Sequence, residues 1–138
     1  MSPYPRSRPG AAAYQQTAAH AGVAAADPHR LVLMLMDGAL DRMASAKGAI
    51  ANNSTELKGR MIQRAIAIVD ELRSSLNLEA GGEIAANLNA LYDYFSRQLM
   101  RANLENRVEP IDEVANLMRE VRTAWLALPG ATARAATP

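Results

Sequence analysis

The chain has 138 residues, with 15 Lys and Arg against 14 Asp and Glu, two His and no Cys. This composition indicates one small domain and excludes a disulfide framework and a strongly basic nucleic-acid-binding protein. One Trp, four Tyr and one Phe are too few aromatic residues for a β sandwich or barrel. No apolar run approaches the roughly 20 residues that span a bilayer, and no signal-peptide core follows the start, so we expect a cytoplasmic protein without stable membrane insertion.

Composition divides the chain into three parts. Residues 1–26 are predicted to be a mobile N-terminal segment, in which residues 11–26 favour a short helix that forms only while it is docked. Residues 27–128 carry the periodic apolar pattern of a helical bundle. Residues 129–138, which begin with Pro and Gly, are predicted to be a disordered tail.

The helices are predicted in chain order from their start and stop signals. Asp27 and Pro28 begin the first, which runs to about residue 51. The second spans about 54–76, with Asn53 and Glu56 as a reciprocal capping box. The third follows the Gly-rich break at 79–83 and ends near 106, and the fourth runs from Pro110 to about 128. Short links force neighbouring helices antiparallel, so the predicted fold is all-α, an up-down four-helix bundle.

Several apolar side chains exceed what the interior of such a bundle needs. Leu33 and Leu40 lie about 100° away from the inward stripe of the first helix, and Ile62 and Ile66 widen the stripe of the second. Two tyrosines, Tyr92 and Tyr94, flank the stripe of the third helix, at its rim. A contiguous apolar surface of this kind is typical of a groove that binds amphipathic helices. The alternatives are that the N-terminal helix or a homodimer covers the surplus.

The sequence offers no constellation for catalysis or metal binding. The two imidazoles, His20 and His29, form no metal-ligand spacing with other residues. Asp37 and Asp41 share a helical face, but nothing in the sequence indicates the cleft that acid/base chemistry needs, and Gly81-Gly82 lacks the pattern of a phosphate-binding loop. We therefore expect no enzyme activity, no catalytic residues, no metal and no cofactor.

Three segments together resemble the flagellin-specific export chaperone family, FliS, over nearly all of residues 14–128. They are residues 31–39 (LVLMLMDGA), residues 68–72 (IVDEL), and residues 87–94 (NLNALYDY) followed by Ala102-Asn103. Their order and spacing, with Tyr14 upstream and Trp125 in the last helix, carry the resemblance. Met36 departs from the pattern, because the family often has an aromatic residue there, and this implies a looser or wider pocket.

The resemblance implies a cytoplasmic, ATP-independent export chaperone built as an antiparallel helical bundle. Its client would be the disordered C-terminal segment of flagellin, which it keeps from polymerising prematurely and helps to deliver to the flagellar type III export apparatus. An export-gate component or a co-chaperone are further partners that the resemblance allows, and the chain would be a monomer or weak homodimer. The resemblance also implies that the segment around Tyr14 lies over the bundle until the client displaces it. The candidate flagellin contacts are Tyr14, Leu33, Met36, Leu40, Ile62, Ile66, Val69, Tyr92 and Tyr94. The competing hypothesis is a homodimeric structural or adaptor bundle with no unfolded client.

Overall fold

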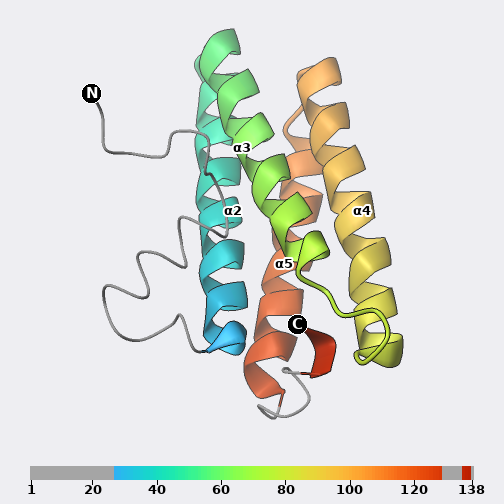
Figure 1. Cartoon of the computed structure of the whole chain (residues 1–138). Helices are drawn as coiled ribbons and strands as arrows, with labels where there is room; N and C mark the ends of the chain where they lie inside the picture. Colours follow the sequence, from blue (N-terminus) through green and yellow to red (C-terminus); the bar gives the residue numbers. More distant parts are fainter. Residues whose placement is uncertain (1–26, 129–134, 138) are drawn as a thin grey trace, which may run out of the picture.

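The computed structural model describes residues 27–128 and 135–137, and within them it contains four long α-helices and no strand. They are α2 (Pro28–Ala51), α3 (Thr55–Ser74), α4 (Gly82–Glu105) and α5 (Glu109–Ala127). Successive helices run in opposite directions, so that each lies beside the next and α5 returns to α2 (Figure 1). The prediction of an all-α, antiparallel up-down four-helix bundle is confirmed, whereas the N-terminal helix and Tyr14 lie outside the described residues.

The start of α2 follows the predicted chemistry, and the start of α3 does not. The Asp27 carboxylate accepts a hydrogen bond from the Arg30 amide at 3.3 Å, and Pro28 occupies the first turn, as predicted. At α3 the N-cap is Ser54, whose side chain makes no capping hydrogen bond. The predicted capping box is wrong because Asn53 has a φ of +56° and serves to reverse the chain, a left-handed conformation that Asn tolerates well.

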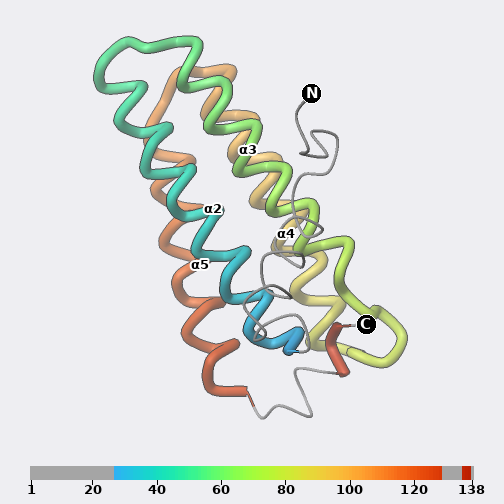
Figure 2. Tube along the Cα trace, turned by 60° about the vertical axis from the view of Figure 1, so that its left-hand side comes forward, coloured from blue at the N-terminus to red at the C-terminus, as the bar shows by residue number. Residues whose placement is uncertain are grey.

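The two later turns also depend on left-handed residues. Gly82 is the first residue of α4 and has a φ of +54°. Glycine adopts this left-handed conformation without steric cost, so the chain can turn at the Gly-rich break and begin α4 there. Asn106 follows α4 with a φ of +55°, and Pro110 lies in the first turn of α5. The links span residues 52–54, 75–81 and 106–108, and they are short enough to make successive helices antiparallel (Figure 2).

A single apolar core fills the bundle, and α2 and α3 pack against each other most extensively. Its largest fully buried side chains include Tyr92 and Phe95, whose ring centroids lie 6.2 Å apart at an angle of 59°. Small residues such as Ala39, Ala46 and Ala65, all fully buried, allow the helices to approach closely. The alanine-rich composition is therefore used for close helix contact rather than for large buried side chains.

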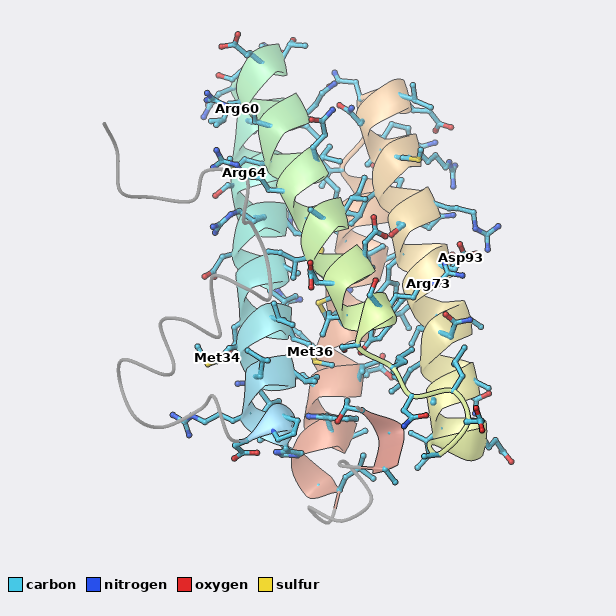
Figure 3. The ribbon with its side chains drawn as sticks, in the orientation of Figure 1. Met34, Met36, Arg60, Arg64, Arg73 and Asp93 are labelled. Atoms are coloured by element: carbon cyan, nitrogen blue, oxygen red, sulfur yellow. The ribbon has the colours of Figure 1, made fainter. Side chains whose placement is uncertain are left out.

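Polar pairs fix the register of the helices. Asp37 accepts two hydrogen bonds from the Arg122 guanidinium, at 2.7 and 3.1 Å, across the α2–α5 seam. On the other side of the bundle, Arg73 pairs with Asp93 at 3.1 Å, and Figure 3 shows these two side chains between α3 and α4. Lys58, only 7% exposed, donates to the Asn103 carbonyl at 3.2 Å and so joins the same two helices at their other end. None of the described helices combines the length and apolar character needed to cross a bilayer.

Candidate functional site

Four of the predicted contact residues are part of the core. Met36 and Val69 are 0% exposed, and Ile62 and Tyr92 are 1% exposed. The expectations that Ile62 exceeds what the interior needs and that Tyr92 lies at the rim are therefore wrong. Each helix of a four-helix ring has two neighbours, so its buried arc is wider than one stripe, and residues beside the stripe are buried as well. Figure 3 shows the contrast on α2, where Met36 points into the bundle and Met34 points away from it.

The half-buried residues do not form one surface. Leu40 lines a hollow between α2 and α5, and Leu33, seven residues earlier, lies on the same edge of α2. Ile66 lies on the edge of α3 that faces α4, because Arg73, seven residues later on the same stripe, bonds to α4. Leu33 and Leu40 therefore share one side of the bundle, and Ile66 lies on another.

Tyr94, midway along α4, is linked to Glu113 in the first part of α5. Its hydroxyl donates a hydrogen bond to the Glu113 carboxylate at 2.7 Å, and its ring packs against the core. The hydrogen bond to Glu113 favours the protonated phenol and raises the pKa of Tyr94 above its ordinary value. Tyr94 is thus a partly exposed bridge rather than a free aromatic at the rim.

An apolar groove runs between α4 and α5, near the start of α4 and the end of α5. Its volume is about 260 Å³. It is lined by Ile84, Asn87, Leu88, Val121, Ala124, Trp125 and Leu128. The polar side-chain groups in this lining are the Asn87 amide and the indole N–H of Trp125. A hollow of this size between two helices, lined by branched aliphatic side chains, suits the side chains of a third helix.

The groove has a rigid floor, because Trp125 is clamped to the first turn of α2. Its indole N–H donates to the His29 carbonyl at 2.9 Å, and His29 Nε2 donates to the Trp125 carbonyl at 2.7 Å. The two rings are stacked, with centroids 5.4 Å apart and planes at 12°. Because a carbonyl oxygen only accepts, the proton of this imidazole is assigned to Nε2. His29 therefore has a structural role here.

A second hollow, of about 230 Å³, lies between α2 and α5. Its apolar lining is formed by Leu40, Met43, Ala44 and Ala115. Lys47, Asp112 and Arg119 surround these residues with charge. The ion pairs Asp37–Arg122 and Lys47–Asp112 lie on either side of Leu40 along α2. This mixed lining contrasts with the uniformly apolar groove between α4 and α5.

Sequence reasoning missed the α4–α5 groove because Ile84, Leu88, Val121 and Trp125 all fit the inward stripes of their helices. One signal was available. Leu117, which packs against the core while half-buried, lies seven residues before Ala124 on the edge of α5 that lines the groove, and it widens the apolar stripe of that helix. An apolar stripe wider than the interior needs indicates a seam that the chain's own residues fill incompletely.

The described residues hold no group of three or more His, Asp or Glu side chains that could bind a metal ion. The fold and the grooves together define a small helical-bundle protein with two open hollows beside α5.

The chain belongs to the FliS family, whose model, described as "Flagellar protein FliS", matches residues 10–131. It is 44% identical over 112 residues to "Flagellar secretion chaperone FliSB" of Pseudomonas aeruginosa, covering 81% of this chain and 89% of the relative. It is 38% identical over 117 residues to "Flagellar secretion chaperone FliS" of Vibrio cholerae, covering 85% and 86%. The corresponding protein of Salmonella typhimurium is 40% identical over 117 residues, with 84% and 87% covered.

Proposed function

We propose that this chain is a cytoplasmic export chaperone that binds the disordered C-terminal segment of flagellin. In this role it keeps flagellin from polymerising prematurely and assists its delivery to the flagellar type III export apparatus. Membership of the FliS family and the printed names of its relatives support the broader role of a flagellar secretion chaperone. The flagellin segment is the finer part of the proposal.

The observation that carries the proposal is the apolar groove between α4 and α5. A bundle gains stability when its own side chains fill the seam between two helices. An open hollow lined by Ile84, Leu88 and Val121 therefore lowers the stability of the bundle unless another polypeptide packs into it. An amphipathic client helix would place side chains spaced three and four residues apart along the groove.

The energetics favour a client that wraps around more than one groove. Ordering a disordered segment typically takes 2 to 5 kcal/mol or more from the gross interaction free energy. At about 25 cal/mol per Å², this cost alone needs roughly 100 to 200 Å² of buried apolar surface. We therefore propose that the client contacts both the α4–α5 groove and the α2–α5 hollow beside Leu40, since α5 lines both.

The predicted contacts divide accordingly. Leu33, Leu40, Ile66 and Tyr94 are half-buried and remain proposed client contacts. The buried residues Met36, Ile62, Val69 and Tyr92 would support the surface from beneath rather than touch the client. Tyr14 stays a proposed contact on the sequence resemblance alone.

We propose that the chain acts by binding, without catalysis and without nucleotide hydrolysis. Its sequence has no G-x-x-x-x-G-K-[ST] loop to hold the phosphates of ATP. At the export apparatus, the client would be released when a competitor binds the same apolar segment of the client. An export-gate component or a co-chaperone is the proposed competitor.

The test is a calorimetric titration with a peptide from the C-terminal segment of flagellin. We expect saturable binding with a gain of helicity by circular dichroism and a negative heat-capacity change. Ala124→Glu should weaken binding at least tenfold, because Ala124 is exposed and lines the groove, so the substitution puts a carboxylate into it without disturbing the core. Ala127→Glu, at another exposed alanine of α5 outside the groove, is the matched control and should bind like the unaltered chain.

Three outcomes decide between the proposals. Absence of binding by the unaltered chain contradicts the flagellin assignment. Equal affinities for Ala124→Glu and Ala127→Glu contradict the groove. A tight dimer that Leu33→Asp separates, together with no peptide binding, would favour the homodimeric structural bundle instead.

A further inference from the structure

Arginine side chains from two helices meet at the seam between α2 and α3. Asp37 and Lys47 lie on the edge of α2 that faces α5, because both form ion pairs with α5. Arg42 lies on the other edge of α2, which faces α3. It is nine residues before the last residue of α2, and Arg64 is nine residues after the first residue of α3. Since the two helices are antiparallel and joined by a short link, Arg42 and Arg64 lie at the same height, roughly 14 Å from the link.

On α3, Arg60 and Arg64 lie on the edge that faces away from α4. Arg73, whose guanidinium bonds to α4, follows Arg64 by nine residues, which is about two and a half turns, so these two side chains leave the helix on opposite edges. Arg60 is one turn before Arg64, and Figure 3 shows both on the side of α3 away from Arg73 and Asp93. Arg60 and Arg64 are exposed, and Arg42 is half-buried.

The side chains of Arg42, Arg60 and Arg64, here called the arginine cluster, make no hydrogen bond or ion pair with any residue that the structure describes. Glu56 has the i,i+4 spacing of a helical ion pair with Arg60, but the pair does not form. Arg60 and Arg64 have the same spacing, and like charges so placed destabilise a helix. The other arginines that pair with carboxylates are Arg73, Arg97, Arg101, Arg107 and Arg122. The arginine cluster therefore combines unused donors with a repulsion that bound carboxylates would remove.

The surroundings of the arginine cluster indicate which kind of anion fits it. Three acidic residues lie beside it in the sequence pattern of the two helices, namely Asp41, Glu56 and Glu71. An anionic membrane would face these carboxylates as well as the arginines, whereas a polypeptide segment can place a different side chain opposite each. Three guanidinium groups are also fewer than the phosphate contacts of a typical nucleic-acid-binding surface. Leu57, three residues before Arg60 and 37% exposed, adds an apolar contact at one end.

We infer that the arginine cluster binds an acidic segment of a partner polypeptide through Arg–carboxylate pairs, with an apolar side chain of the segment against Leu57. The α2–α3 seam lies across the four-helix ring from the α4–α5 groove. The acidic partner and a client in the groove therefore do not compete for the same surface. This inference goes beyond the proposed function and does not depend on it.

The experiment measures the fluorescence anisotropy of a labelled peptide made of Glu residues around one central Leu. It is titrated with the full-length chain at low salt and in the absence of flagellin, so the result is independent of the proposed client. A peptide in which every Glu is replaced by Gln is the uncharged probe. The test variant is Arg60→Gln with Arg64→Gln. The matched control is Arg97→Gln with Arg101→Gln, which removes the same charge at the same spacing from an exposed face of α4, where each arginine already has a carboxylate partner.

The unaltered chain and the control variant should bind the Glu peptide with equal affinity, and the test variant should bind at least tenfold more weakly. Binding of the unaltered chain should weaken as salt is added, and the Gln peptide should not bind. The test variant should keep the thermal midpoint of the unaltered chain, since it removes a repulsion and no contact.

Three results would overturn the inference. One is the absence of Glu-peptide binding by the unaltered chain. Another is an equal loss of affinity in the test and control variants, which would mean that net charge alone attracts the peptide. The third is binding to vesicles of phosphatidylcholine and phosphatidylserine through Arg60 and Arg64 without binding of the peptide, which would assign the arginine cluster to a membrane surface. Each of these leaves the flagellin titration, and with it the proposed function, unaffected.

Discussion

The contact between His29 and Trp125 allows a quantitative test of how the groove floor is held. Trp125→Phe keeps an aromatic ring in place but removes the indole N–H that donates to the His29 carbonyl. The lost hydrogen bond costs about 1 kcal/mol, and the smaller ring of Phe at a site only 2% exposed costs about 1 kcal/mol more. His29→Ala removes the reciprocal bond to the Trp125 carbonyl and the ring stacking, which together are worth about 2 kcal/mol.

The two substitutions should not be additive. Once either bond is broken, the ends of α2 and α5 separate more easily, so the remaining bond contributes less. The double variant should cost at least about 0.5 kcal/mol less than the sum of the single ones. Urea unfolding followed by far-UV circular dichroism is the suitable assay, because Trp125 is the only Trp and its replacement abolishes tryptophan fluorescence.

Two results would refute the clamp. Either single variant losing less than about 0.5 kcal/mol would mean that the bond is not formed in solution. Strict additivity would mean that the two bonds are independent. Glu120→Ala, at an exposed position of α5, serves as the control and should change the free energy of unfolding by less than about 0.5 kcal/mol.

Three further predictions concern single residues. Burial raises the pKa of Tyr92 above its ordinary value of 10.0, so Tyr92 ionises more easily in the unfolded chain than in the folded one. The free energy of unfolding should therefore fall as the pH rises above about 10. Urea melts at several pH values should show a smaller fall for Tyr92→Phe. Gly82→Ala should cost about 1 kcal/mol in thermal melts because φ of Gly82 is +54°. Gly48→Ala, in the last turn of α2 with open space around it, should instead stabilise the chain by about 0.5 to 1 kcal/mol, and the same sign for both substitutions would contradict the left-handed turn. The hydrogen bond to Asp37 raises the pKa of Arg122, and both side chains are partly exposed. Asp37→Asn should therefore lower the free energy of unfolding by only about 0.5 kcal/mol, and by less in high salt. A loss of stability that is the same at every salt concentration would argue against an ion pair.

The number, order and approximate ends of the helices in residues 27–128 could be predicted because each depends on local chemistry. Asp27 and Pro28 begin α2 through a side-chain cap and a fixed φ, and neither needs a tertiary partner. The capping box at Asn53 failed for a reason of the same local kind. Asn can either cap a helix or adopt a left-handed turn, and the short link to α3 required the turn.

The candidate site was predicted less well, since periodicity shows which residues are apolar but not which neighbour they face. Ile62 and Tyr92 were buried by a second neighbouring helix, and only the register between helices decides this. The burial of Ala136, whose carbonyl accepts a hydrogen bond from the Asn77 amide at 2.8 Å, could not have been anticipated at all. Alanine carries no distinctive side chain, and its partner group is the Asn77 backbone amide, which every residue except Pro possesses.

The seam between α2 and α5 has a consequence for the order of folding. Asp37 and Arg122 are 85 residues apart in the chain, whereas α2 and α3 are joined by a tight turn. Bringing distant segments together costs loop entropy that neighbouring hairpins avoid, so we expect the α2–α3 and α4–α5 hairpins to form before they join each other. Native-state hydrogen exchange should then find the first and last helices separating at free energies below that of global unfolding, which would give the bundle a natural line along which to part without losing its hairpins.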